Sequence, residues 1–230
     1  MRKLFSIKIA NLGLNNLHNK ISNRPPDETL DYGTYDVELQ DNVLSGYFWT
    51  REKIIILDEL DIHASAEPVT IHKVNRFTFT LRRIKDFDYL LNIESSSKSI
   101  KPLIRHLQNI TETKVYISQI EISLTDFVDH LEKENMPLLK ATHAYATNQT
   151  ISNSEKITFS IYSSENAITA AQTIINNKNL KFDRIRLHTS NQGRSVTLDI
   201  KSNGLYSASE AKSDIEKEMI AYVLKTQAHN

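Results

Sequence analysis

The sequence predicts an α+β protein: an antiparallel β-rich N-terminal part followed by an α+β part that ends in a β-hairpin and a helix. Before residue 94, most segments alternate apolar and polar residues, as half-buried strands do. After residue 95, apolar residues recur at helical spacing between further alternating segments. We therefore expect two domains, residues 1–94 and 95–230.

The N-terminal part has the pattern of a β-meander with one early helix. Strands are expected at 5–9, 35–39, 44–50, 53–57, 69–84 and 87–93, and the helix at 14–21, before Pro25 and Pro26. The polar pair Arg51-Glu52 is interpreted as the turn of a hairpin between the strands at 44–50 and 53–57.

The second part alternates helices and strands. Helices are expected at 100–107, 124–131 and 167–175, and strands at 114–123 and 156–162, whereas 138–147 has no clear pattern. Residues 182–188 and 196–201 both alternate, and Gly193 between them can adopt the positive φ of a tight turn. This predicts an antiparallel hairpin. Ser213 and Glu216 then have the spacing of a capping box for a final helix.

Composition excludes several classes of site. The chain of 230 residues has no cysteine, which removes disulfides, thiolate metal ligands and cysteine nucleophiles. It has five glycines and no glycine-rich phosphate loop. No apolar run approaches the roughly 20 residues of a membrane span. We expect a cytoplasmic protein with no cofactor and no membrane association.

The net charge is zero, but the charges are unevenly distributed. Residues 27–67 contain eleven acidic and two basic residues, whereas 73–85 contain five basic residues and no acid. Residues 178–201 contain six basic residues and two acids. Segregated charge can give a neutral protein one basic face, although such segments can also neutralise one another in the fold.

Arginines on the predicted strands are the leading candidate site. Backbone phosphates of a nucleic acid could be contacted by Arg76, Arg82, Arg83, Arg184, Arg186 and Arg194. No catalytic motif accompanies these arginines. The leading hypothesis is therefore a non-enzymatic protein that binds nucleic acid or a nucleic-acid-handling partner. Phe77 and Phe79, which alternate with Arg76 and Thr78, would act as a base-stacking platform if they were exposed, or as core residues if they were buried.

A metal-dependent nuclease is the main alternative. Asp183 on one hairpin strand and Asp199-Ile200-Lys201 on the next match the acid followed by acid-x-Lys of such sites. Asp183 and Asp199 would hold Mg²⁺, and Lys201 would orient water or stabilise charge on the phosphate. This requires the three side chains to converge.

A protein-interaction module is the third possibility. The acidic segment 27–67 could present a surface that mimics the charge of nucleic acid. Within it, residues 58–63 (DELDIH) could ligate a cation, although they lack the glycine and spacing of a calcium-binding loop.

Residues 182–224 resemble the C-terminal part of RexA-type phage-exclusion proteins. The similarity consists of an Ile185-x-Leu187 strand, a polar turn with Gly193, a second strand, a Gly204-x-x-Ser207 step and a helix carrying Glu218-Met219 and Ala221-Tyr222. It covers less than a fifth of the chain. The resemblance implies a non-enzymatic, nucleic-acid-associated protein in phage–host conflict.

Overall fold

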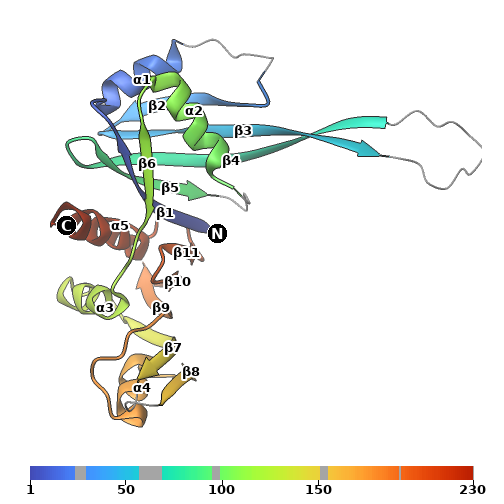
Figure 1. Ribbon diagram of the computed structural model, residues 1–230. Coiled ribbons are helices and arrows are strands. Elements are labelled where there is room, and N and C mark those ends of the chain that lie inside the picture. Colours follow the sequence, from blue (N-terminus) through green and yellow to red (C-terminus); the bar gives the residue numbers. More distant parts are fainter. Residues whose placement is uncertain (24–29, 57–68, 95–98, 151–154, 192, 230) are drawn as a thin grey trace, which may run out of the picture. The chain divides into compact units, whose positions relative to one another are not determined.

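The computed structural model describes residues 1–230 except 24–29, 57–68, 95–98, 151–154, 192 and 230 (Figure 1). Among the described residues, strands make up 48% and five helices 28%, so the fold is α+β-like with antiparallel sheet dominating. The chain divides into two compact units: the N-terminal unit, residues 7–117, and the C-terminal unit, residues 1–6 and 118–230. The changes of unit fall within strands β1 (Arg2–Ile9) and β6 (Val115–Gln119), whereas the sequence suggested a boundary at 94.

The N-terminal unit contains the predicted meander. Its strands follow the order β2-β3-β4-β5 and are covered on one face by two helices: β2 (Tyr32–Gln40), β3 (Val43–Ile56), β4 (Val69–Lys85), β5 (Asp88–Glu94), α1 (Leu14–Ser22) and α2 (Lys101–Thr111). On the helix side, Phe48 is fully buried and its ring centroid lies 5.2 Å from that of Phe77 and 5.7 Å from that of His106.

The expected hairpin that turns at Arg51-Glu52 is wrong. Strand β3 continues through these residues, and its partner β4 pairs with it in register from Val43↔Arg82 to Ile56↔Val69. Arg51 lies opposite Val74 and Glu52 opposite Lys73. A polar pair inside an alternating pattern therefore marks solvated positions of one long strand, and not a turn.

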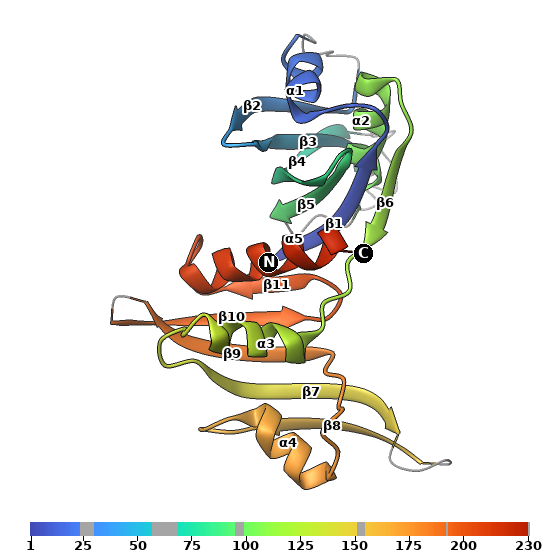
Figure 2. The same ribbon diagram turned by 90° about the vertical axis from the view of Figure 1, so that its left-hand side faces the viewer.

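The C-terminal unit has strands in the order β11-β10-β9-β7-β8. Its elements are α3 (Leu124–Lys133), β7 (Lys140–Thr150), β8 (Lys156–Tyr162), α4 (Ala167–Ile175), β9 (Arg184–Asn191), β10 (Arg194–Lys201), β11 (Leu205–Ala208) and α5 (Asp214–His229). All three helices lie on the same face of these strands, which leaves the other face open (Figure 2). Among the described residues, no helix combines the length and the apolar character needed to cross a membrane.

The predicted hairpin of 182–201 is confirmed as β9 and β10. Pairs run from Arg194↔Asn191 to Lys201↔Arg184, and Gly193 has a φ of +78° at the turn. Alternation places Ile185, Leu187, Leu198 and Ile200, all fully buried, under the helices. The segment without a clear pattern, 138–147, is mostly β7, which pairs with both β8 and β9.

The final helix begins where predicted, but the capping box does not form. The buried hydroxyl of Ser213 has no hydrogen-bond partner among the described residues. The Glu216 carboxylate instead accepts bonds from the Lys212 N–H (2.8 Å), the Tyr206 hydroxyl (3.0 Å) and the Arg2 guanidinium (2.5 Å). Because Glu216 is only 5% exposed, its three partners satisfy a buried charge, and they tie β1 and β11 to α5.

Candidate functional site

Two arginines share one carboxylate at the centre of the open face of the C-terminal unit. The register puts Arg186 opposite Asp199 and Arg184 opposite Lys201. Arg184 donates from Nε and Nη2 to the two Asp199 oxygens at 2.7 and 2.6 Å, and Arg186 donates from Nε and Nη2 to Oδ2 at 3.1 and 2.9 Å. The Nη1 atoms take part in none of these bonds. We call Arg184, Arg186, Asp199 and Lys201 the arginine cluster.

The arginine cluster keeps a net positive charge. The side chain of Asp199 is 15% exposed, whereas those of Arg184 and Arg186 are 36% and 40% exposed. Burial acts to raise the pKa of Asp199, but hydrogen bonds and charge from both arginines outweigh it and the pKa is lowered. Asp199 is therefore ionised at neutral pH, and it fixes two guanidinium groups side by side with part of each facing solvent.

A histidine and a tyrosine lie next to the arginine cluster, and the sequence analysis did not identify them. His143 on β7 pairs with Arg186 on one side and Tyr162 on the other. The His143 and Tyr162 rings stack at 4.3 Å, and His143 Nε2 lies 2.8 Å from the Ser160 hydroxyl. Burial lowers the pKa of His143, and both arginines lower it further. The imidazole is therefore neutral at pH 7.

The Ser160–His143 pair lacks the third member of a catalytic triad. A triad needs a carboxylate on the far ring nitrogen, which orients the imidazole. The Nδ1 atom of His143 is buried and has no hydrogen-bond partner within the described part of the chain. Nearby Asp199 is already bound by the two arginines. The arrangement therefore gives no support to serine chemistry. It presents Tyr162, which is 73% exposed, as a stacking surface beside the cations.

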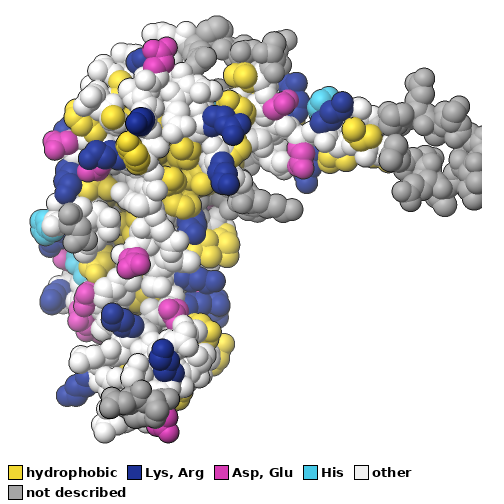
Figure 3. Space-filling view, viewed as in Figure 1, with side chains coloured by type: hydrophobic (Ala, Val, Ile, Leu, Met, Phe, Trp, Pro, Cys, Tyr) yellow, Lys and Arg dark blue, Asp and Glu magenta, His cyan; other side chains and the backbone are white. Residues whose placement is uncertain are grey.

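The other predicted basic residue of this unit lies further along the hairpin. Arg194 starts β10 next to the turn and is exposed. Figure 3 shows Lys and Arg side chains together with apolar ones over the strands of this unit, on the side away from its helices.

Asp183 does not join Asp199. It directly precedes β9, and its Oδ2 accepts bonds from the backbone N–H (2.6 Å) and the hydroxyl (2.7 Å) of Thr147, at an irregular step of β7. Asp199 is bound by arginines on the open face, with Lys201 two residues along the strand. The two carboxylates thus have separate structural partners, and the convergence that the nuclease alternative requires is not found.

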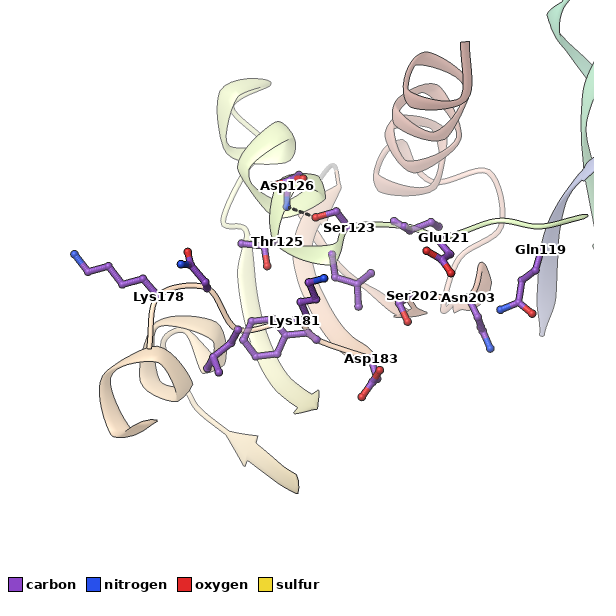
Figure 4. A pocket seen from close by; sticks show the side chains of 15 residues that line it. Gln119, Glu121, Ser123, Thr125, Asp126, Lys178, Lys181, Asp183, Ser202 and Asn203 are labelled. Carbon is purple, nitrogen blue, oxygen red and sulfur yellow. Dashed lines mark hydrogen bonds between the residues drawn. The ribbon is translucent and has the colours of Figure 1, made fainter. Parts of the chain in front are cut away.

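Asp183 instead lines a polar pocket of about 760 Å³ beside the start of α3 (Figure 4). The labelled side chains around it include Glu121, Asp126 and two lysines, Lys178 and Lys181. Mixed charge of this kind favours no single ligand class. Across the described ranges, no three His, Asp or Glu residues are grouped to hold a metal. The acidic run 58–63 lies outside the described residues.

The remaining predicted arginines lie on β4 in the N-terminal unit. Arg76 and Arg82 lie on the open face of β4, and Arg82 donates to the Thr80 hydroxyl at 3.0 Å. Arg83 is exposed, but it lies at a position of the opposite parity along the strand. Phe77 and Phe79 are 6% and 1% exposed, so they are core residues and not a platform.

Aromatic residues that the sequence analysis did not single out lie on the open face instead. Tyr35 on β2 and Tyr47 on β3 are register partners with stacked rings, and Trp49 follows two residues after Tyr47. The signal was present in the alternation of β3, where Leu44 and Phe48 are buried and Tyr47 and Trp49 have the opposite parity.

No protein-family model matches the chain, and a search of curated proteins returned no significant match.

Proposed function

We propose that the protein is a non-enzymatic nucleic-acid-binding protein whose arginine cluster contacts backbone phosphates. The observation that carries this proposal is the cluster itself, with three cations against one carboxylate on a face that the unit's helices leave open. A buried structural ion pair would hide its guanidinium groups, but these are more than a third exposed.

The geometry suits phosphate better than it suits a single carboxylate. Each guanidinium is a planar fork, and Asp199 occupies only the Nε and Nη2 donors. The Nη1 donors of neighbouring forks can meet the oxygens of a phosphate, and Lys201 adds a third charge. Because Asp199 already holds both arginines in place, less side-chain entropy is lost on binding.

We extend the proposal to phage–host conflict, on the resemblance of residues 182–224 to RexA-type phage-exclusion proteins. That segment comprises β9, β10, β11 and most of α5, and it therefore contains the arginine cluster. The arginine cluster supports contact with phosphate, and the resemblance alone supports the extension to phage–host conflict.

Salt-dependent binding of fluorescently labelled 20-nucleotide DNA and RNA, followed by anisotropy, tests the proposal. We expect binding at about 50 mM salt that weakens steeply as salt is raised. The double variant Arg184→Gln/Arg186→Gln should lose at least about tenfold in affinity and about two units of salt slope, because two phosphate contacts are lost.

Two further variants control for folding and for net charge. Lys201→Gln removes a cation without breaking an Asp199 bond and should weaken binding about threefold to tenfold. Lys133→Gln/Lys225→Gln removes two exposed charges from α3 and α5 on the helix-covered side and should change affinity little. Absence of binding at about 50 mM salt, or equal losses in both double variants, would overturn the proposal.

A further inference from the structure

The open face of the N-terminal unit carries three aromatic rings on two adjacent strands. Tyr35 on β2 stacks on its register partner Tyr47 on β3, with ring centroids 5.0 Å apart and planes 13° from parallel. Trp49 lies one position further on the same face of β3. Tyr47 is 41% exposed, and Tyr35 and Trp49 are partly exposed. These three rings are called the aromatic row.

The indole of Trp49 lies close against the backbone of β2. Its register partner is Gly33, and a Cβ at that position would lie 2.9 Å from the indole Nε1 and 3.1 Å from Cε2. Any other residue would push the ring away from the strand. The missing side chain at Gly33 therefore lets the ring occupy the surface of the sheet, where a flat ligand could contact it.

The aromatic row is not a displaced part of the core. The core of this unit lies on the opposite face, where Phe48, Phe77 and Phe79 are buried towards α1 and α2. Alternation along β3 separates the two sets completely, because successive side chains of a strand point to opposite faces. Three partly exposed rings side by side, on the face away from the core, favour a role other than packing the fold.

Two arginines accompany the rings. The Arg76 guanidinium lies 5.9 Å from the centroid of Tyr35, and that of Arg51 lies 5.6 Å from the centroid of Trp49. Both distances fall within the range of cation–π contact. Glu94, at the β5 side of this face, accepts a bond from the Thr78 hydroxyl at 3.3 Å. Glu38, opposite Ser45, also lies on this face, but the charged groups placed over the rings are the two arginines, and this favours an anionic ligand.

We infer that the aromatic row, with Arg76 and Arg51, stacks the unpaired bases of a single-stranded nucleic acid. The ligand must combine flat rings with negative charge, and a single strand supplies both, whereas a duplex keeps its bases stacked inside. The inference rests on the proposed function, which gives nucleic acid as the ligand, but it concerns residues of the N-terminal unit instead of the C-terminal unit. It adds selectivity for unpaired strands, which phosphate contacts alone do not give.

Trp49 is the single tryptophan of the chain, so its emission reports directly on this face. The unlabelled full-length protein is titrated with a 12-nucleotide oligothymidine and with a duplex of the same length. We expect the single strand to quench Trp49, with a midpoint equal to the Kd that anisotropy gives for the same oligonucleotide, and the duplex to quench it little.

Variants locate the contact. Tyr47→Ala should weaken single-strand binding by about fivefold to a hundredfold, because stacking one base contributes roughly 1–3 kcal/mol. Arg76→Gln should weaken it by about threefold to tenfold. Tyr116→Ala is the matched control: Tyr116 lies on β6 in the same unit, is 58% exposed and should have no effect.

The outcomes separate this inference from the proposed function. Binding without quenching, with Tyr47→Ala unchanged, overturns the inference and leaves the proposed function standing. Equal quenching by the duplex also overturns it. If no nucleic acid binds by either readout, both fail, and a change in Trp49 emission with an acidic peptide alone would assign the face to a protein partner.

Discussion

The open face of the C-terminal unit is organised by ion pairs, whereas that of the N-terminal unit is organised by rings. In the first, Asp199 holds Arg184 and Arg186 at 2.6–2.9 Å through its closest contacts. In the second, Arg76 and Arg51 lie over Tyr35 and Trp49, and the tyrosines stack on each other. Both units present arginines on a half-covered sheet, but they fix them by different physical means.

The difference has a consequence for any shared ligand. Contacts between arginine and phosphate weaken with salt, because counterions compete and are released on binding. Stacking on aromatic rings depends mainly on buried area and dispersion, and it is much less sensitive to salt. If one polymer uses both faces, its residual affinity at high salt should come from the aromatic row. Loss of the arginine cluster should therefore change the salt slope more than loss of Tyr47.

Breaking the ion-paired face should produce the largest change in stability. Asp199→Ala leaves two adjacent guanidinium groups without their shared carboxylate, and we expect the free energy of unfolding to fall by about 2–3 kcal/mol. Urea unfolding followed by far-UV circular dichroism measures it. Emission of Trp49 in the same samples reports on the N-terminal unit, so a smaller shift in that signal would localise the damage.

A matched control for Asp199 is Asp214 in the same unit. Asp214 pairs with Lys217 at 2.8 Å, but this pair is on the surface, with side chains 58% and 65% exposed. Exposed pairs contribute little because water screens them, so Asp214→Ala should leave the unfolding midpoint nearly unchanged. Equal losses in the two variants would contradict a structural role for the shared carboxylate.

Displacing the indole should have the next largest effect. Gly33→Ala introduces a Cβ 2.9 Å from Trp49 Nε1, so the ring must rotate away from β2, at a cost of about 1 kcal/mol. We expect a shift of the Trp49 emission maximum and weaker single-strand binding, with no change in charge. Gly13→Ala is the control, because nothing lies within 4 Å of a Cβ at that position. An unaltered emission spectrum in Gly33→Ala would show that the indole does not lie against β2.

The sequence predicted the strands and their faces better than it predicted the site. Period-two alternation is a local property, so the hairpin of β9 and β10 and the long strand β4 could be recognised. The pairing of Arg184 and Arg186 with Asp199 depends on the register of the two strands. Alternation does not fix that register, because a shift by two residues leaves every side chain on the same face. The position of the Asp183 side chain could not be predicted either. Its hydrogen bonds come from Thr147, which lies on a strand whose sequence had no clear pattern.

The aromatic row was missed for a related reason. Tyr35, Tyr47 and Trp49 lie on two strands, and only the register Tyr35↔Tyr47 and Gly33↔Trp49 makes them neighbours. Phe77 and Phe79 could be considered as a base-stacking platform from the sequence alone, because they lie on one strand and next to arginines. Both are buried in the folded unit, where the Phe77 ring packs against Phe48, and the sequence does not reveal this tertiary packing.

Lowering the pH, so that His143 beside the arginine cluster becomes protonated, should have the smallest effect on the free energy of unfolding, and the sign of this effect can be predicted. Burial and the two arginines hold the pKa of His143 below its usual 6.5. The unfolded chain therefore takes up a proton in a pH range where the folded unit does not, so the free energy of unfolding falls as pH drops below 6.5. The pKa of Asp199 is lowered from 3.8, so its contribution is lost only at more acidic pH.

Urea unfolding at pH 7.5 and 5.5 isolates the histidine. The loss of stability on acidification should be smaller in His143→Gln than in the wild type, while His72→Gln, at an exposed position of β4, should keep the wild-type loss. The aromatic row contains no histidine, so Trp49-detected binding of a single strand should change less with pH than binding by the arginine cluster. A His143→Gln variant as sensitive to acid as the wild type would show that protonation of another group sets the stability of this face.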